Sequence, residues 1–193
     1  MTWPFPGLWD AALTYEQFVE AAAPAHRDLW RSVHRLARLP EWARARAAAL
    51  PEPRRLVALS EDWCGDAVNA VPVVARLVEL SPNLAMRVLR RDEHPEVMDR
   101  YLTGGVARSI PVVIALTADM RELGWWGPRP AELQAWVMAQ RAAGVAKKAL
   151  YPEIRRWYAR DRGESVLREV LALLEWSAPL KGAGHSNGNM KVS

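Results

Sequence analysis

The one cysteine of the chain, Cys64, stands in the segment Trp63-Cys64-Gly65-Asp66-Ala67, where an apolar run gives way to a helix-like pattern. A thiol in the first turn of a helix faces unpaired backbone N–H groups and the positive end of the helix dipole, and both stabilise the thiolate over the thiol. Cys64 is therefore a candidate nucleophile near neutral pH. With Ala67 three residues on, the chain offers no second cysteine, so any redox cycle needs an external thiol.

For both Cys64 and Asp66, a structural role is an alternative to a chemical one. A lone cysteine is otherwise a small buried side chain. Asp66 either has a structural role, because a carboxylate is favourable in the first turn of a helix, or accepts and returns a proton near Cys64. The negative charge of Asp66 also opposes formation of the thiolate, and Glu61 and Asp62 lie close by in the sequence, so the net pKa of the Cys64 thiol stays open.

The elements that must position Cys64 follow from the apolar periodicity. A buried strand is predicted over residues 54–60, and apolar positions at helical spacing predict a helix from Asp66 to Leu80, with a kink at Pro72. A second strand is predicted over residues 84–91. Because a helix connects these two strands, we expect them to be parallel.

The rest of the chain predicts a strand hairpin and flanking helices. Residues 110–116 are strongly strand-like, and residues 120–126 are the expected hairpin partner. Two or three helices are predicted over residues 14–50, one over residues 130–142, and a longer one from about Pro152 to Trp176. The expected organisation is a helical N-terminal extension (1–53), a core (54–143), a C-terminal helix packed on the core (144–177) and a disordered tail (178–193).

Composition indicates a globular protein and excludes several classes. The 193 residues are half hydrophobic and one quarter charged, and the net charge of +4 comes with no nucleic-acid signature. We therefore expect no nucleic-acid partner. No apolar stretch is long enough to cross a bilayer, so a membrane is not an expected partner either. Four scattered histidines and one cysteine predict no metal site. A single cysteine agrees with a reducing compartment, and we expect a cytoplasmic protein.

An ordered set of motifs resembles the thioredoxin superfamily, and more narrowly a bacterial branch with EDWCGDA in place of the usual dithiol motif. The motifs are Glu61-Asp62-Trp63-Cys64-Gly65-Asp66-Ala67, Leu89-Arg90-Arg91-Asp92, Tyr101-Leu102-Thr103-Gly104-Gly105, Arg108-Ser109-Ile110-Pro111 and Trp126-Gly127-Pro128-Arg129. The resemblance covers roughly residues 54–143. It implies an α/β thioredoxin fold, a central mixed sheet of about four strands flanked by helices, with added N-terminal and C-terminal helices.

The resemblance also implies roles for particular residues. The Ile110–Pro111 bond should be cis and lie beside Cys64, with the Ile110 backbone exposed to pair with an extended peptide or a glutathione-like substrate. Trp63 should shield one side of the thiol. The candidate catalytic residues are Cys64 and Asp66, and the candidate substrate-binding residues are Trp63, Gly65, Ile110 and Pro111.

Departures from the dithiol pattern decide the expected chemistry. Ala67 replaces the resolving cysteine of thioredoxin, and Ala58 replaces its buried acid. Arg108 and Arg129 either hold a carboxylate of a glutathione-like thiol or form structural salt bridges. The resemblance thus implies a monothiol thiol-disulfide oxidoreductase without a cofactor. Its partners would be protein or low-molecular-weight disulfides and an external thiol reductant, with a low-molecular-weight thiol as the candidate co-substrate.

Two other functions are compatible with the same residues. One is a non-catalytic adaptor that binds partner segments at the groove of the cis-proline. The other is a single-cysteine redox sensor, because a lone exposed thiolate is readily oxidised to sulfenic acid.

Overall fold

A four-stranded mixed sheet lies at the centre of the computed structural model, which describes residues 2–176. Its strands are β1 (Arg54–Ser60), β2 (Leu84–Arg90), β3 (Val112–Thr117) and β4 (Glu122–Trp126), in the spatial order β2-β1-β3-β4. β1 pairs in parallel with β2, and the β1–β3 and β3–β4 pairs are antiparallel. The predicted mixed sheet is confirmed, including the parallel pair on either side of the crossover helix.

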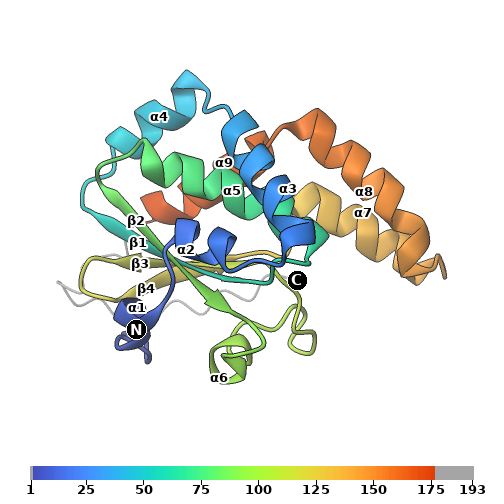
Figure 1. Cartoon of the computed structure of the whole chain (residues 1–193), viewed down its shortest axis with the longest axis horizontal. Helices are drawn as coiled ribbons and strands as arrows, with labels where there is room; N and C mark the ends of the chain where they lie inside the picture. Colours follow the sequence, from blue (N-terminus) through green and yellow to red (C-terminus); the bar gives the residue numbers. More distant parts are fainter. Residues whose placement is uncertain (1, 177–193) are drawn as a thin grey trace, which may run out of the picture.

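Helices cover one face of the sheet in a continuous layer (Figure 1). These helices are α2 (Tyr15–Glu20), α3 (Pro24–Leu36), α4 (Glu41–Ala48), α5 (Gly65–Glu79) and α9 (Glu164–Glu175). The core between sheet and helices contains Leu56 and Ala58 from β1 and Val113 from β3, all fully buried. The N-terminal helices therefore belong to the same core as the sheet, because α3 packs directly along α5.

The opposite face of the sheet is covered by shorter segments. Val57 and Leu59 point to this side and pack with Trp3 and Trp9, which come from the segment around α1 (Leu8–Ala11). Residues in and after α6 (Pro95–Met98) complete this second core. β1 is thus buried on both faces, which explains why its sequence is a continuous apolar run rather than an alternating one.

A helical hairpin stands between β4 and the last helix. It consists of α7 (Ala131–Ala142) and α8 (Lys147–Asp161), which extend to the side of the sheet (Figure 1). The two helices share a small apolar cluster that includes Leu133, Ile154 and Tyr158. This hairpin brings α8 close to the start of α5, where the cysteine lies.

The prediction of one long helix from Pro152 to Trp176 is wrong. The chain forms two helices there, α8 and α9, and Pro152 lies inside α8 instead of starting it. The break occurs because Arg162 and Gly163 both have left-handed backbone conformations, with φ of 55° and 83°. Gly163 was the sequence signal for this break, since glycine commonly ends a helix in this conformation.

Local side chains and prolines mark the starts of the N-terminal helices. Thr14 and Gln17 form a capping box at the start of α2. Pro24 is the first residue of α3, whereas Pro40 is the N-cap residue of α4. α5 is one helix with Pro72 inside it, and the kink expected there stays a prediction. The tail predicted for residues 178–193 lies outside the described residues.

A glycine substitution tests the junction of α8 and α9. A Cβ atom at Gly163 would lie 2.8 Å from both methyl groups of Val73 on α5, whereas a Cβ at Gly144 meets nothing within 4 Å. Both glycines have φ close to 82°. We expect Gly163→Ala to lower the free energy of unfolding by about 3 kcal/mol, and Gly144→Ala by about 1 kcal/mol, because only the first adds a clash to the backbone strain.

Urea denaturation of both variants measures the difference. Adding Val73→Ala to Gly163→Ala should recover part of the extra loss, because it removes the clashing methyl groups. Equal losses for Gly163→Ala and Gly144→Ala would contradict this account of the junction.

Candidate active site

Cys64 is placed by the end of β1 and the start of α5. It is the N-cap residue of α5, with an extended backbone, and its carbonyl accepts the first helical hydrogen bond from the Val68 N–H. The backbone N–H groups of Asp66 and Ala67 therefore point toward the sulfur, as expected for the first turn of a helix. The side chain is partly buried and forms no disulfide.

Two acids just before the cysteine anchor the loop that carries it. Glu61 is buried, and one of its carboxylate oxygens accepts a hydrogen bond of 2.8 Å from the Asp92 N–H after β2. Asp62 accepts a hydrogen bond of 2.7 Å from the Ala23 N–H at the start of α3, and its carbonyl accepts one from the Trp30 indole. The loop is thus held between the end of β2 and the added helix α3.

The cysteine and the predicted cis-proline lie side by side. The Ile110–Pro111 bond is cis, as the resemblance implied, and the Cys64 Sγ lies 3.5 Å from the Ile110 carbonyl oxygen. The exposure expected for the Ile110 backbone is wrong, because Ile110 is only 5% exposed and Pro111 is buried. The loop after β4 covers this place: a Cβ at Gly127 would lie 2.1 Å from the Pro111 oxygen.

Asp66 takes part in a buried ion pair beside the cysteine. Its carboxylate accepts two hydrogen bonds from the Arg129 guanidinium, one of them 2.9 Å long, and a third from the Tyr158 hydroxyl on α8. Burial raises the pKa of the Asp66 carboxyl, although Arg129 and Tyr158 act in the opposite direction. Arg129 thus forms a salt bridge, one of the two roles open to it from the sequence, as does Arg108 with Asp99.

The pKa of the Cys64 thiol is raised above its ordinary value. Burial is the largest cause, and the negative charge of Asp66 raises it further, as the sequence suggested. The N–H groups of Ala67 and Asp66 and the Arg129 cation lower the pKa but do not outweigh burial. The sequence left the net pKa of Cys64 open, and the burial of the thiol in the folded protein is what moves that pKa upward.

Trp63 and Gly65 lie at the open side of the cysteine. The Trp63 side chain is 52% exposed, and the Arg91 guanidinium lies over its ring, 5.1 Å from the ring centre. Trp63 and Gly65 line a pocket of about 530 Å³ that opens beside Cys64. Ile110 and Pro111 do not line this pocket. The structure therefore divides the predicted substrate-binding residues between two sides of the sulfur.

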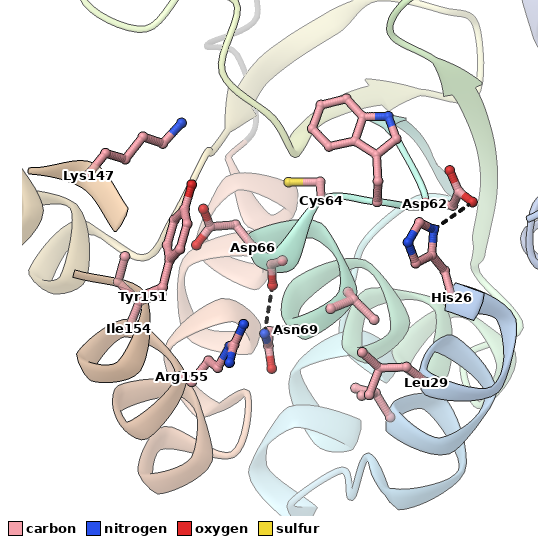
Figure 2. Close-up of a pocket in the computed structure, with 14 residues that line it drawn as sticks. His26, Leu29, Asp62, Cys64, Asp66, Asn69, Lys147, Tyr151, Ile154 and Arg155 are labelled. Carbon is pink, nitrogen blue, oxygen red and sulfur yellow. Dashed lines mark hydrogen bonds and ion pairs between the residues drawn. The ribbon is translucent and has the colours of Figure 1, made fainter. Parts of the chain in front are cut away.

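Figure 2 shows how three helices form this pocket. Asp66 and Asn69 of α5 lie in its middle, Leu29 of α3 lies on one side, and Tyr151 and Arg155 of α8 lie on the other. The complete lining is His26, Leu29, Val33, Asp62, Trp63, Cys64, Gly65, Asp66, Val68, Asn69, Lys147, Tyr151, Ile154 and Arg155. The sulfur thus meets a cavity whose walls come from segments far apart in the sequence.

Sequence reasoning missed the contributions of α3 and α8. Tyr158 and the α8 residues of the pocket follow the cysteine by more than eighty positions, and no motif connects them to it. The one available signal was the spacing of Tyr151, Ile154 and Tyr158, which places them on one face of a helix. That spacing indicates a packed face but does not say what the face packs against.

Neither a metal centre nor a membrane segment is found in the part of the chain that the structure describes. Among residues 2–176 there is no group of three or more His, Cys, Asp or Glu side chains placed to hold a metal ion. Within the same residues, no helix is both long and apolar enough to cross a bilayer.

Comparisons with known structures agree with the fold. Two solved structures are similar to the chain at the level of the fold. One is a protein of unknown function from Pseudomonas aeruginosa, 19% identical, with a TM-score of 0.71, covering 89% of this chain and 96% of the other. The second is an HIV epitope scaffold, 18% identical, with a TM-score of 0.70, covering 90% of this chain and 99% of the other.

The sequence comparisons point to one family. No curated protein matches the sequence. The family model Thioredoxin_9, described as thioredoxin, matches residues 12–146, a span that includes α3, the cysteine loop, the whole sheet and α7. Because this match extends over most of the chain, the protein belongs to the thioredoxin family.

Proposed function

We propose that the protein is a monothiol thiol-disulfide oxidoreductase that acts through Cys64 and depends on an external thiol. The observation that carries this proposal is the position of the sulfur. It lies at the N-cap of α5, beside the Ile110 carbonyl and at the edge of an open pocket. A thiol that served only as packing would have no reason to border a cavity of this size.

The reaction has two exchange steps. The Cys64 thiolate attacks one sulfur of a disulfide R–S–S–R′, forming a bond between Sγ and R–S, and R′–S⁻ leaves with the electron pair of the broken S–S bond. An external low-molecular-weight thiol, as its thiolate, then attacks the R–S sulfur. This step forms a new disulfide between R–S and the external thiol and returns the Cys64 thiolate. The proton of each thiol is lost before attack, and the departing thiolates take up protons.

The groups around Cys64 have opposite effects on the first step. The N–H groups of Asp66 and Ala67 stabilise the negative sulfur, and Arg129 adds a favourable charge. Burial and the Asp66 carboxylate oppose ionisation. In the proposed mechanism Asp66 takes the thiol proton, since its carboxylate lies close enough to the thiol in the first turn of α5 to act on it electrostatically. We place this activity in a reducing compartment, the cytoplasm, where a single cysteine stays reduced.

A non-catalytic binding protein is the second candidate. The raised pKa of Cys64 favours it, because a protonated thiol is a weak nucleophile. The absence of a second thiol and of a buried acid at Ala58 agrees with it as well. The buried backbone at Ile110 argues against the groove of the cis-proline as the binding surface in this conformation.

Substitution of the cysteine tests the proposed activity. Cys64→Ser removes the one cysteine thiol of the chain and should reduce the release of thiol from a mixed disulfide to the uncatalysed rate of glutathione alone. Absorbance assays of thiol release measure this, and circular dichroism checks that the variant is folded. Undiminished turnover in Cys64→Ser would reject the proposal.

The charge of Asp66 should appear in the pH dependence of alkylation. Because the folded-state pKa of Cys64 is raised, the rate of reaction with iodoacetamide should keep rising with pH beyond the midpoint of an unstructured cysteine peptide. Asp66→Asn removes a negative charge next to the thiol, so its midpoint should lie below that of the unmodified protein.

The matched control is Glu79→Gln, which makes the same change of charge at the far end of α5. Its alkylation midpoint should equal that of the unmodified protein. A midpoint in Asp66→Asn that stays the same or moves upward would contradict the electrostatic account of the site.

Restoring the missing cysteine tests why the chemistry is monothiol. Ala67 is fully buried in the first turn of α5, three residues after Cys64. Ala67→Cys should allow a mixed disulfide on Cys64 to resolve within the chain, without an external thiol. Mass spectrometry of the trapped adduct would show its loss with time. Ala70→Cys, also buried on α5, is the control that should leave the adduct in place. Persistence of the adduct in both variants would contradict the prediction.

A further inference from the structure

Half of the residues that line the pocket beside Cys64 come from two helices outside the strand–helix–strand unit that carries the cysteine. One wall comes from α3 and the other from α8, with the first two turns of α5 between them (Figure 2). Ile110 and Pro111 do not line it. This pocket is therefore distinct from the groove of the cis-proline, and a volume of about 530 Å³ lies within the usual range for small-molecule sites.

The lining of the pocket is mostly apolar on both sides. Leu29 and Val33 contribute from α3, Val68 from α5, and Tyr151 and Ile154 from α8. Leu29 is 55% exposed and Tyr151 is 41% exposed, so large apolar surfaces face the opening. Covering such surfaces is favourable for a ligand with an apolar body.

Two cations on α8 give the pocket a positive rim. Lys147 and Arg155 are both exposed, and within residues 2–176 neither has a carboxylate partner or a hydrogen bond from its side chain. Their neighbour Arg156, which does not line the pocket, is paired with Glu153. An anionic group would complement these two charges.

The acids of the pocket already have partners of their own. Asp66 is paired with Arg129, and Asp62 is held by the Ala23 N–H and by His26, whose Nδ1 lies 3.1 Å from it. Arg90 also lies 4.0 Å from Asp62, so each of these acids faces a guanidinium of the protein. The Lys147 cation helps to lower the pKa of the Asp66 carboxyl, although it forms no ion pair with it. Lys147 and Arg155 are therefore the cations of the pocket that are available to an anionic ligand.

We propose that this pocket binds a low-molecular-weight disulfide that carries a carboxylate on an apolar body. The disulfide sulfur would lie at Cys64, the body against Leu29, Val68 and Ile154, and the carboxylate at the rim beside one of the two cations, which stand about 12 Å apart along α8. This inference rests on the proposed function, because it names the substrate class of the same sulfur. Attack by Cys64 gives a protein mixed disulfide and one free thiolate, as in the first exchange step above.

Two aromatic disulfides of different charge test this assignment. One is 5,5′-dithiobis(2-nitrobenzoate), which has a carboxylate on each ring, and the other is 4,4′-dithiodipyridine, which has none. We expect Lys147→Ala/Arg155→Ala to lower the second-order rate constant of Cys64 with the first probe about tenfold, because the positive rim that attracts a carboxylate is lost. The rate with the neutral probe should change less than about twofold, because that probe has no carboxylate. A change in the pKa of Cys64 would alter the rates of both probes alike, so it cannot produce this difference.

The matched control is Lys148→Ala/Arg156→Ala. It makes the same change of net charge on the same helix, at two positions that do not line the pocket. Both probes should react with it as they do with the unmodified protein. Equal losses for the two probes in the pocket variant, or equal losses of the anionic probe in the pocket and control variants, would overturn the proposal.

Calorimetry separates this inference from the proposed function. The Cys64→Ser protein should bind 5,5′-dithiobis(2-nitrobenzoate) without reaction, and the added Lys147→Ala/Arg155→Ala changes should weaken that binding about tenfold. If the Cys64→Ser protein binds the probe in this way but the unmodified protein shows no turnover, the assignment of the pocket is retained and the oxidoreductase activity is rejected. Turnover in the unmodified protein without such binding would retain the oxidoreductase and reject the pocket.

Discussion

The ion pair between Asp66 and Arg129 joins three parts of the molecule at one point. Asp66 belongs to the first turn of α5, Arg129 to the loop after β4, and Tyr158, which donates to the same carboxylate, to α8. Removing one member of a buried pair leaves an uncompensated charge, which typically costs about 3–5 kcal/mol. The pair therefore fixes the start of α5 against the sheet and holds α8 beside it, and both the surroundings of Cys64 and one wall of the pocket depend on it.

The same arrangement explains why the sulfur is less acidic than its place at a helix start suggests. Helix N–H groups and Arg129 favour the thiolate, but burial and Asp66 favour the thiol more strongly. The carbonyl of Ile110, 3.5 Å from Sγ, accepts a hydrogen bond that only the protonated form donates. A substrate that brings a disulfide into contact with the sulfur would meet a thiol held by this hydrogen bond, with a pKa that burial has raised.

The two central strands, β1 and β3, were predictable because almost all of their residues are buried, which gives continuous apolar runs in the sequence. The apolar run of residues 54–60 coincides with β1, and the other three strands begin or end within two residues of the predicted limits. The break between α8 and α9 was not predictable from periodicity, because apolar positions continue on both sides of the turn at Arg162 and Gly163. The neighbourhood of Cys64 and Pro111 came from the family resemblance, whereas Tyr158, Lys147 and Arg155 gave no sign of it. Their distance in sequence is bridged only by the packing of the α7–α8 hairpin.

The sequence alone determined which reactive groups the protein has. It contains one thiol, with alanine at both positions where a dithiol enzyme has its second cysteine and its buried acid, and these facts do not depend on folding. The tertiary structure decided how that thiol behaves. Its pKa, the cover over Ile110 and the cationic rim of the pocket arise from through-space distances among α3, the start of α5, the loop after β4 and α8. Desolvation and Coulomb energies depend on those distances and not on separation along the chain.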